Sequence, residues 1–222
     1  MYGNKIIVWL YTGFVLGVLA CTNAYAQYEP NDDYSTFVLS YQSSKFSTPV
    51  CIGGECHDSI SGPVVIYARQ LIPNLAIGMS GSQLQSSGKI SSIKGTNVSL
   101  FVQAIAGMGS RVDIGASVAA LSASTDLCTT IPSSCTSSSD IGTDVGVFGK
   151  VFLTEHKTVS VNLGYDAIYF EKLPNKTIIG LSLVGIVAQH HRLAISTNSV
   201  RDASGNEISG GLGFGYSYIV NY

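Results

Sequence analysis

The sequence predicts an all-β chain, an antiparallel transmembrane β-barrel of ten strands. Three observations predict it: apolar residues that alternate with small or polar ones, connections that alternate between long and short, and an export signal at the start of the chain. Only 12% of the 222 residues are charged while 45% are hydrophobic, a composition that excludes intrinsic disorder. The net charge of −2 offers no basic footprint for a nucleic-acid partner.

The first 26 residues are predicted to be a cleaved signal peptide. Lys5 precedes an uncharged run from Ile6 to Ala20, and Ala24-Tyr25-Ala26 supplies a small-x-small cleavage site. The run is too short for a spanning helix, which needs about 20 residues. The mature barrel domain is therefore expected to cover residues 27–222. An alternative takes Val18-Leu19-Ala20-Cys21 as a lipoprotein signal with Cys21 as the lipid-bearing N-terminus.

Period-two alternation marks the predicted strands. In Thr158–Phe170 one face carries Val159, Val161, Leu163, Tyr165, Ala167 and Tyr169, and the other carries small and polar residues. Such a strand is about 33 Å long and, tilted by about 40°, covers about 25 Å of membrane. The predicted strands are Tyr34–Lys45, Pro63–Leu71, Leu75–Leu84, Asn97–Ala106, Arg111–Leu121, Ile141–Phe152, Thr158–Phe170, Thr177–Ala188, Arg192–Val200 and Ile208–Tyr222. A count of eight is the architectural alternative.

The predicted connections alternate in length. The long ones are rich in Ser, Thr, Gly and Asp and cover Phe46–Gly62, Gln85–Thr96, Ser122–Asp140, Glu171–Lys176 and Arg201–Glu207. Tight turns lie between them, so antiparallel strands place every long loop on one side, as in an outer-membrane barrel. A secreted soluble β-sandwich is the alternative fold. Its solvent face would carry many charges, whereas small residues suit a narrow lumen better.

The C-terminal strand gives the most specific signal. Its outward residues alternate without a break and are Leu212, Phe214, Tyr216, Tyr218, Val220 and Tyr222. This pattern resembles the terminal strand of small Gram-negative outer-membrane barrels, such as the OmpA membrane domain and OmpX. The resemblance implies insertion in the cell outer membrane, recognition of the strand by the barrel-assembly machinery, and contact with outer-membrane lipid and lipopolysaccharide.

The four mature cysteines form two close pairs, Cys51 with Cys56 and Cys128 with Cys135. An exported chain with an even number of paired cysteines predicts two local disulfides. Free thiols remain an alternative. Zinc ligation by Cys51, Cys56 and His57 would need further ligands, so no metal site is expected.

The histidines do not form a predicted catalytic site. His57 falls in the first long loop, and His156 and His190-His191 fall in short turns at the opposite end. No residue stands near them in the arrangement of the outer-membrane lipid A deacylases or aspartate-type proteases. The sequence therefore predicts neither an enzyme nor a cofactor.

Charged residues on the lumen side form the remaining candidate constellation, and they are Arg69, Asp113, Asp144, Lys150 and Asp166. They either pair within a packed interior or line a narrow water-filled pathway. A hairpin symmetric about Glu155 would place Asp144 directly opposite Asp166, Val145 opposite Tyr165 and Val147 opposite Leu163. Such a carboxylate pair predicts either neutralisation by an inward cation or an acidic constriction.

The predicted function is a structural or surface-interaction role through the disulfide-stapled loops. A narrow porin-like channel for ions or small solutes is one alternative, and a secreted soluble adhesin is the other.

Overall fold

The computed structural model describes residues 30, 32–130, 132–188 and 190–220. The predicted signal peptide, the alternative lipid-bearing Cys21, Gln27 and Tyr222 lie outside the described residues. Within the described ranges, no helix is long and apolar enough to span a membrane.

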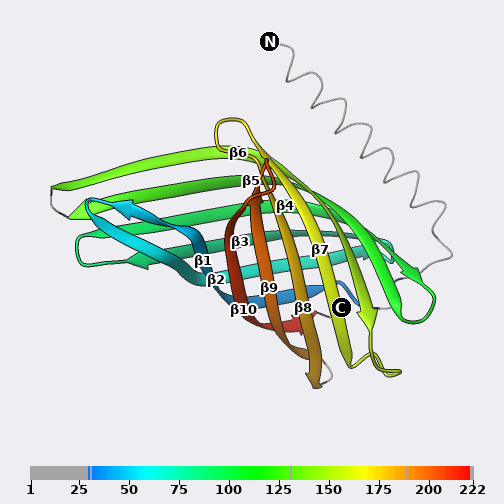
Figure 1. Ribbon diagram of the computed structural model, residues 1–222. Coiled ribbons are helices and arrows are strands. Elements are labelled where there is room, and N and C mark those ends of the chain that lie inside the picture. The colour runs from blue at the N-terminus through cyan, green and yellow to red at the C-terminus, as the bar shows by residue number, and fades with distance from the viewer. Residues whose placement is uncertain (1–29, 31, 131, 189, 221–222) are drawn as a thin grey trace, which may run out of the picture.

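The chain folds into ten antiparallel strands in which each strand pairs with its sequence neighbours and β1 closes on β10 (Figure 1). The strands are β1 Thr36–Ile52, β2 Glu55–Ile72, β3 Leu75–Ser87, β4 Ser91–Met108, β5 Val112–Thr130, β6 Ser133–Phe152, β7 Val159–Phe170, β8 Lys176–Ala188, β9 His191–Asp202 and β10 Glu207–Ile219. The predicted ten-stranded barrel is confirmed. The alternatives of eight strands and of a sandwich are wrong.

The barrel has an apolar outer face and a polar or small inner face. On β10, Leu212 and Phe214 are 61% and 64% exposed, while the intervening Gly213 is buried. The same alternation places Leu193 and Ile195 of β9 outside and Ala194 and Ser196 inside. These outward apolar side chains do not pack in a protein core. They form the lipid-facing band of a membrane barrel.

Six of the strands continue beyond this band as a protruding sheet. Strands β7 to β10 have 12 or 13 residues, whereas β4, β5 and β6 have 18, 19 and 20. The hairpins β1–β2, β3–β4 and β5–β6 extend together to one side (left in Figure 1). We call this part, residues 47–60, 85–95 and 122–141, the extension.

The extension corrects the predicted loop boundaries. The segments Phe46–Gly62, Gln85–Thr96 and Ser122–Asp140 are mostly paired strand and not loop. Two residues suffice for the turn between β1 and β2, because Gly53 and Gly54 both adopt positive φ, of 60° and 88°. Adjacent residues of this conformation make the hairpin turn whose twist matches that of its strands.

The register of β6 and β7 differs by two residues from the predicted one. Asp144 lies opposite Ile168, and Asp166 lies opposite Gly146, so the two carboxylates are diagonal neighbours. Likewise Tyr165 lies opposite Val147 and Leu163 opposite Gly149. The turn is centred one residue later than predicted. Its loop is closed by Thr154 Oγ1, which accepts the amides of Thr158 and Val159 at 2.8 and 3.3 Å.

Candidate functional site

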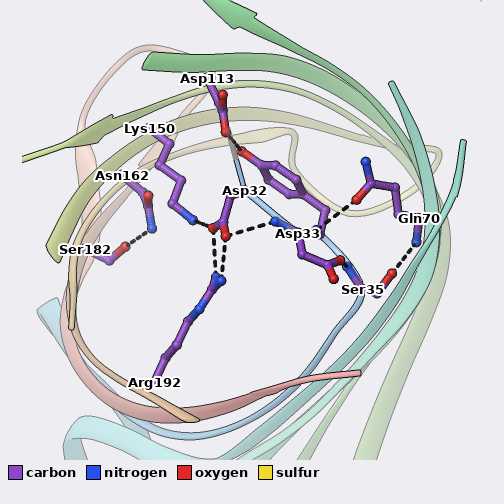
Figure 2. Close-up of polar contacts among 10 residues, drawn as sticks. Asp32, Asp33, Ser35, Gln70, Asp113, Lys150, Asn162, Ser182 and Arg192 are labelled. Atoms are coloured by element: carbon purple, nitrogen blue, oxygen red, sulfur yellow. Dashed lines mark hydrogen bonds and ion pairs between the residues drawn. The ribbon is translucent and has the colours of Figure 1, made fainter. Parts of the chain in front are cut away.

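A segment from the N-terminal side of β1 enters the barrel lumen at the end that carries the short turns. We call residues 32–35 the plug. Figure 2 shows Asp32 held between Lys150 of β6 and Arg192 of β9. Two hydrogen bonds to Ser35 anchor the segment to the barrel. The amide of Val220 donates to Ser35 O at 2.8 Å, and the amide of Gln70 donates to Ser35 Oγ at 3.1 Å.

Asp32 makes the strongest contacts of the plug. Arg192 donates from Nη1 to Oδ2 at 2.8 Å and from Nη2 to Oδ1 at 2.5 Å, and Lys150 Nζ donates to Oδ2. The three side chains are only 8–11% exposed. A bidentate arginine–carboxylate pair fixes both position and orientation. Burial alone would raise the pKa of Asp32, but the charges of Lys150 and Arg192 hold it below its ordinary value.

Tyr34 fills the space beside this ion pair. Its hydroxyl donates to Asp113 Oδ2 at 3.1 Å, and its amide donates to Gln70 Oε1 at 3.1 Å. Its ring lies 6.1 Å from that of Phe148, with Lys150 Nζ 5.5 Å from the ring centroid. Two carboxylates, Asp32 and Asp113, thus stand near the two cations Lys150 and Arg192, so these four charges sum to zero.

The structure places four of the five predicted lumen charges inside the barrel. Lys150 and Asp113 meet at the plug, whereas Asp144 and Asp166 lie further towards the extension. The prediction for the fifth, Arg69, is wrong. Arg69 is exposed and lies opposite Ile77, which is 41% exposed on the lipid face. A long side chain at the rim can bury its stem in the apolar band and keep its charge in water.

Asp144 and Asp166 share their part of the lumen with a cation. Ile168 of β7 pairs with Asp144 of β6 on one side and with Lys176 of β8 on the other. The inward face here therefore carries two carboxylates and one ammonium group. Next to them lies an apolar cluster inside the barrel, made of Leu121, Ala123 and Ile168 with Phe170, Leu173 and Ile178. Both features favour a packed interior over an acidic constriction.

The hairpins of the extension are braced at their tips by Glu55. Its carboxylate accepts the amides of Lys89, Ile90 and Ser91 at 2.7, 3.0 and 2.9 Å, and the hydroxyl of Ser91 at 2.8 Å. These four hydrogen bonds lower the pKa of Glu55 to about 2. A Cβ at Gly88 would lie 2.2 Å from this carboxylate, so only glycine allows the close approach.

The braces connect all three hairpins. Glu55 joins the β1–β2 tip to the turn between β3 and β4. In that turn Ile90 O accepts the amide of Thr130 at 2.8 Å and its hydroxyl at 3.2 Å. The β5–β6 tip is thereby tied to the same turn.

His57 lies beneath this cluster between two serines. Its Nδ1 is 2.9 Å from Ser86 Oγ, and its Nε2 is 2.8 Å from Ser91 Oγ. The order resembles a nucleophile and its base, but His57 and Ser91 are each 4% exposed, and the Ser91 hydroxyl donates to Glu55. The buried His57 and Ser91 therefore brace the hairpins through these hydrogen bonds.

Both predicted disulfides are present, and each joins directly opposite residues of a hairpin. Cys51 pairs with Cys56 across β1 and β2, and Cys128 pairs with Cys135 across β5 and β6. The closed loops are short, so each bond constrains its own hairpin more than the barrel. Among the described residues, no group of three His, Cys, Asp or Glu side chains could hold a metal ion.

The outer edge of β6 is unpaired in the extension. Gly142 is the last residue of β6 opposite β7, and Ser133–Ile141 pair with β5 alone among the described residues. The β7–β8 loop covers the lower end of this edge, where Asp140 Oδ2 accepts the amides of Lys172 and Leu173 at 2.6 and 2.8 Å. Residues 133–139 remain open and carry serine, threonine and one disulfide cysteine.

Two charged residues that meet at the plug, Asp32 and Arg192 of β9, were not among the residues predicted from the sequence. The inward position of Arg192 could have been predicted from the sequence, because Arg192 alternates with the outward Leu193 and Ile195 and must point inward. The position of Asp32 could not have been predicted, because Asp32 precedes the first alternating segment and has no periodic signal.

Comparison with known proteins gives similar folds but no family. No family model matches the chain, and no curated protein matches it. Three similar solved structures are the attachment invasion locus protein Ail of Yersinia pestis, an outer-membrane channel of Pseudomonas putida F1, and the translocator domain of the autotransporter NalP of Neisseria meningitidis. Their sequence identities to this chain are 9%, 9% and 13%, with TM-scores of 0.43, 0.48 and 0.47. The matches cover 82%, 88% and 96% of this chain and 95%, 98% and 97% of the others.

The architecture itself defines the class. An even number of antiparallel strands, full closure, an apolar outer band and a polar interior are the features of a small outer-membrane β-barrel.

The Glu55 brace can be tested by hydrogen exchange. Replacing Glu55 by alanine removes the acceptor of the Lys89, Ile90 and Ser91 amides, so these amides are expected to exchange faster while those of β8 stay protected. Asp58→Ala, an exposed carboxylate on the same strand, is the matched control and should change nothing. Because the folded pKa of about 2 lies below the ordinary 4.5, the brace is complete above pH 4.5 and is lost as the pH falls towards 2. Equal exchange in both variants would contradict this role.

Proposed function

We propose that this protein is a cell-surface interaction protein of the outer membrane, whose extension binds an extended segment of a partner polypeptide along the open edge of β6. The observation that carries the proposal is the braced extension itself. Tips joined by Glu55 and Thr130, together with two disulfides, hold six strands rigid beyond the lipid band. The plug argues against an open channel as the main role, since Asp32 ties it to Lys150 and Arg192 inside the lumen.

The backbone geometry of the edge supports strand addition. The Cα atoms of Cys128 and Cys135 are 4.1 Å apart, the close spacing of a pair whose backbone groups point away from each other. Cys135, Ser137 and Ser139 therefore direct their N–H and C=O groups to the open side. An unpaired edge of this kind is a template for another strand. It lacks the lysines and prolines that commonly block such edges.

The export and insertion route belongs to the same proposal. Cleavage after Ala26 leaves a mature chain that begins at Gln27, a few residues before the plug in the sequence. The barrel-assembly machinery recognises the terminal strand through Leu212, Phe214, Tyr216, Tyr218, Val220 and Tyr222. The apolar band then contacts outer-membrane lipid and lipopolysaccharide.

Peptide selection on two variants tests the edge. A phage-displayed library of random peptides is selected on the refolded barrel, and the enriched peptides are measured on Ser137→Pro and Ser137→Ala. Proline removes an outward N–H without touching the bonds to β5, whereas alanine keeps it. We expect peptides of alternating pattern that lose at least about tenfold in affinity on Ser137→Pro and nothing on Ser137→Ala. No enrichment, or equal binding to the proline variant, would overturn the proposal.

A further inference from the structure

The lumen contains a cavity of about 460 Å³ directly beside the plug. Tyr34 and Lys150 form one end of it, and the wall is contributed by β1, β2, β4 and β6 to β10. Its size is within the range of small-molecule sites. The plug closes the end of the cavity that faces the short turns.

The polar lining is neutral. Apart from Lys150 it carries amide and hydroxyl side chains, among them Ser40, Gln42, Gln103, Asn162, Ser182, Ser196 and Asn198. The one cation, Lys150, is already paired with Asp32. Amides and hydroxyls both donate and accept hydrogen bonds, and a lining without free charge does not repay the desolvation of a charged solute.

Several of these groups have unused hydrogen-bonding capacity. The side chains of Gln103 and Ser196 make no hydrogen bond to any residue that the structure describes. The buried oxygens Oδ1 of Asn162 and Asn198 likewise accept none within the described part of the chain. A buried acceptor without a hydrogen bond destabilises the fold. A hydroxyl-bearing solute would offset that cost after a small rotation of the amides.

An apolar side completes the cavity. Val64, Ile66 and Phe148 lie among the lining residues. The Phe148 ring also covers Gly115, where a Cβ would lie 2.3 Å from it, so the ring is held in place. A rigid aromatic face beside neutral polar groups suits a solute with both C–H and O–H surfaces.

We propose that the cavity is a binding site for one small, neutral, hydroxyl-rich solute of the monosaccharide or polyol class. The site is independent of the β6 edge, because its residues lie inside the barrel wall.

Two glycines provide a variant and its matched control. Gly164 of β7 lines the cavity, and a Cβ built there meets nothing within 4 Å. Gly149 of β6 lies opposite the outward Leu163, on the lipid face, and a Cβ there also meets nothing within 4 Å. Leucine at position 164 therefore occupies the cavity, whereas leucine at position 149 adds the same side chain outside the barrel.

Binding is measured by titration calorimetry of the refolded barrel in a detergent without a sugar headgroup. The probes are glucose, glycerol and, as the charged counterpart, glucuronate. We expect saturable binding of at least one neutral probe, an affinity at least about tenfold lower for Gly164→Leu, an unchanged affinity for Gly149→Leu, and no saturable binding of glucuronate. Loss of affinity in Gln103→Ala would add support for direct contact.

Three results would overturn the proposal. One is no saturable heat with either neutral probe, which means that the cavity holds water only. Another is binding to Gly164→Leu as strong as to the unaltered chain. The third is equal affinity for glucose and glucuronate.

Discussion

Replacing Asp32 by alanine is expected to destabilise the barrel by about 3–5 kcal/mol, the cost of removing one partner from a buried ion pair. Lys150 and Arg192 would then share Asp113 as their one nearby counter-charge among the described residues, since Asp32 now contacts both. The measurement is the urea midpoint of unfolding for the barrel refolded in lipid vesicles. The control is Asp33→Ala, because among the described residues Asp33 Oδ1 accepts only the nearby amide of Ser35, at 2.7 Å.

The Asp32 effect also depends on pH in a defined direction. The folded pKa of Asp32 lies below its ordinary value of 3.8, so its contribution is fully present above that value and is lost as the pH falls through the lower folded pKa. The difference in midpoint between the unaltered chain and Asp32→Ala should therefore shrink in acid. A midpoint difference as small as that of Asp33→Ala at neutral pH would show that the plug does not stabilise the barrel.

Replacing Phe214 by arginine is expected to lower the stability of the inserted barrel by about 2–4 kcal/mol, the cost of a cation in the middle of the lipid face. Phe214 is 64% exposed, and its cross-strand neighbours Ile195 and Tyr41 are also exposed and largely apolar. A charge at this position must leave water for hydrocarbon. The yield of heat-modifiable barrel on unboiled gels, together with the urea midpoint, reports the loss.

The matched control for the lipid face is Ser137→Arg. Ser137 is exposed on the extension and pairs with Asp126 of β5, so the same cation remains in water there. Equal stability of Phe214→Arg and Ser137→Arg would contradict the assignment of the exposed apolar residues to lipid.

The sequence predicted the strands well where one face meets lipid. Leu163 and Tyr165 alternate with Asn162 and Gly164 because the two faces have different surroundings, and β7 was predicted to within a residue. Alternation fails above the membrane, where both faces are in water. The run from Ser133 to Ser139 was therefore interpreted as loop although it continues β6.

The errors within the lumen have separate physical causes. The β6–β7 register depends on the Thr154 hydroxyl, which closes the turn around His156, and such side-chain bonding has no alternating pattern. Arg69 was assigned to the lumen-facing parity of its strand, although Val65 and Leu71 share its parity and are exposed on the lipid face. Asp32 and Arg192 are separated by most of the sequence. Local patterns of residues carry no information on a contact between such distant positions.

Surface labelling tests most directly the central claim that the barrel lies in the outer membrane with its extension outside the cell. Single cysteines are introduced as Ser138→Cys on the extension and His156→Cys in the turn between β6 and β7, both exposed positions. Intact cells are treated with a membrane-impermeant maleimide, and permeabilised cells show that both thiols can react. Labelling of position 138 alone in intact cells is the result that we predict. Labelling of position 156 in intact cells, or protection of position 138, would contradict it.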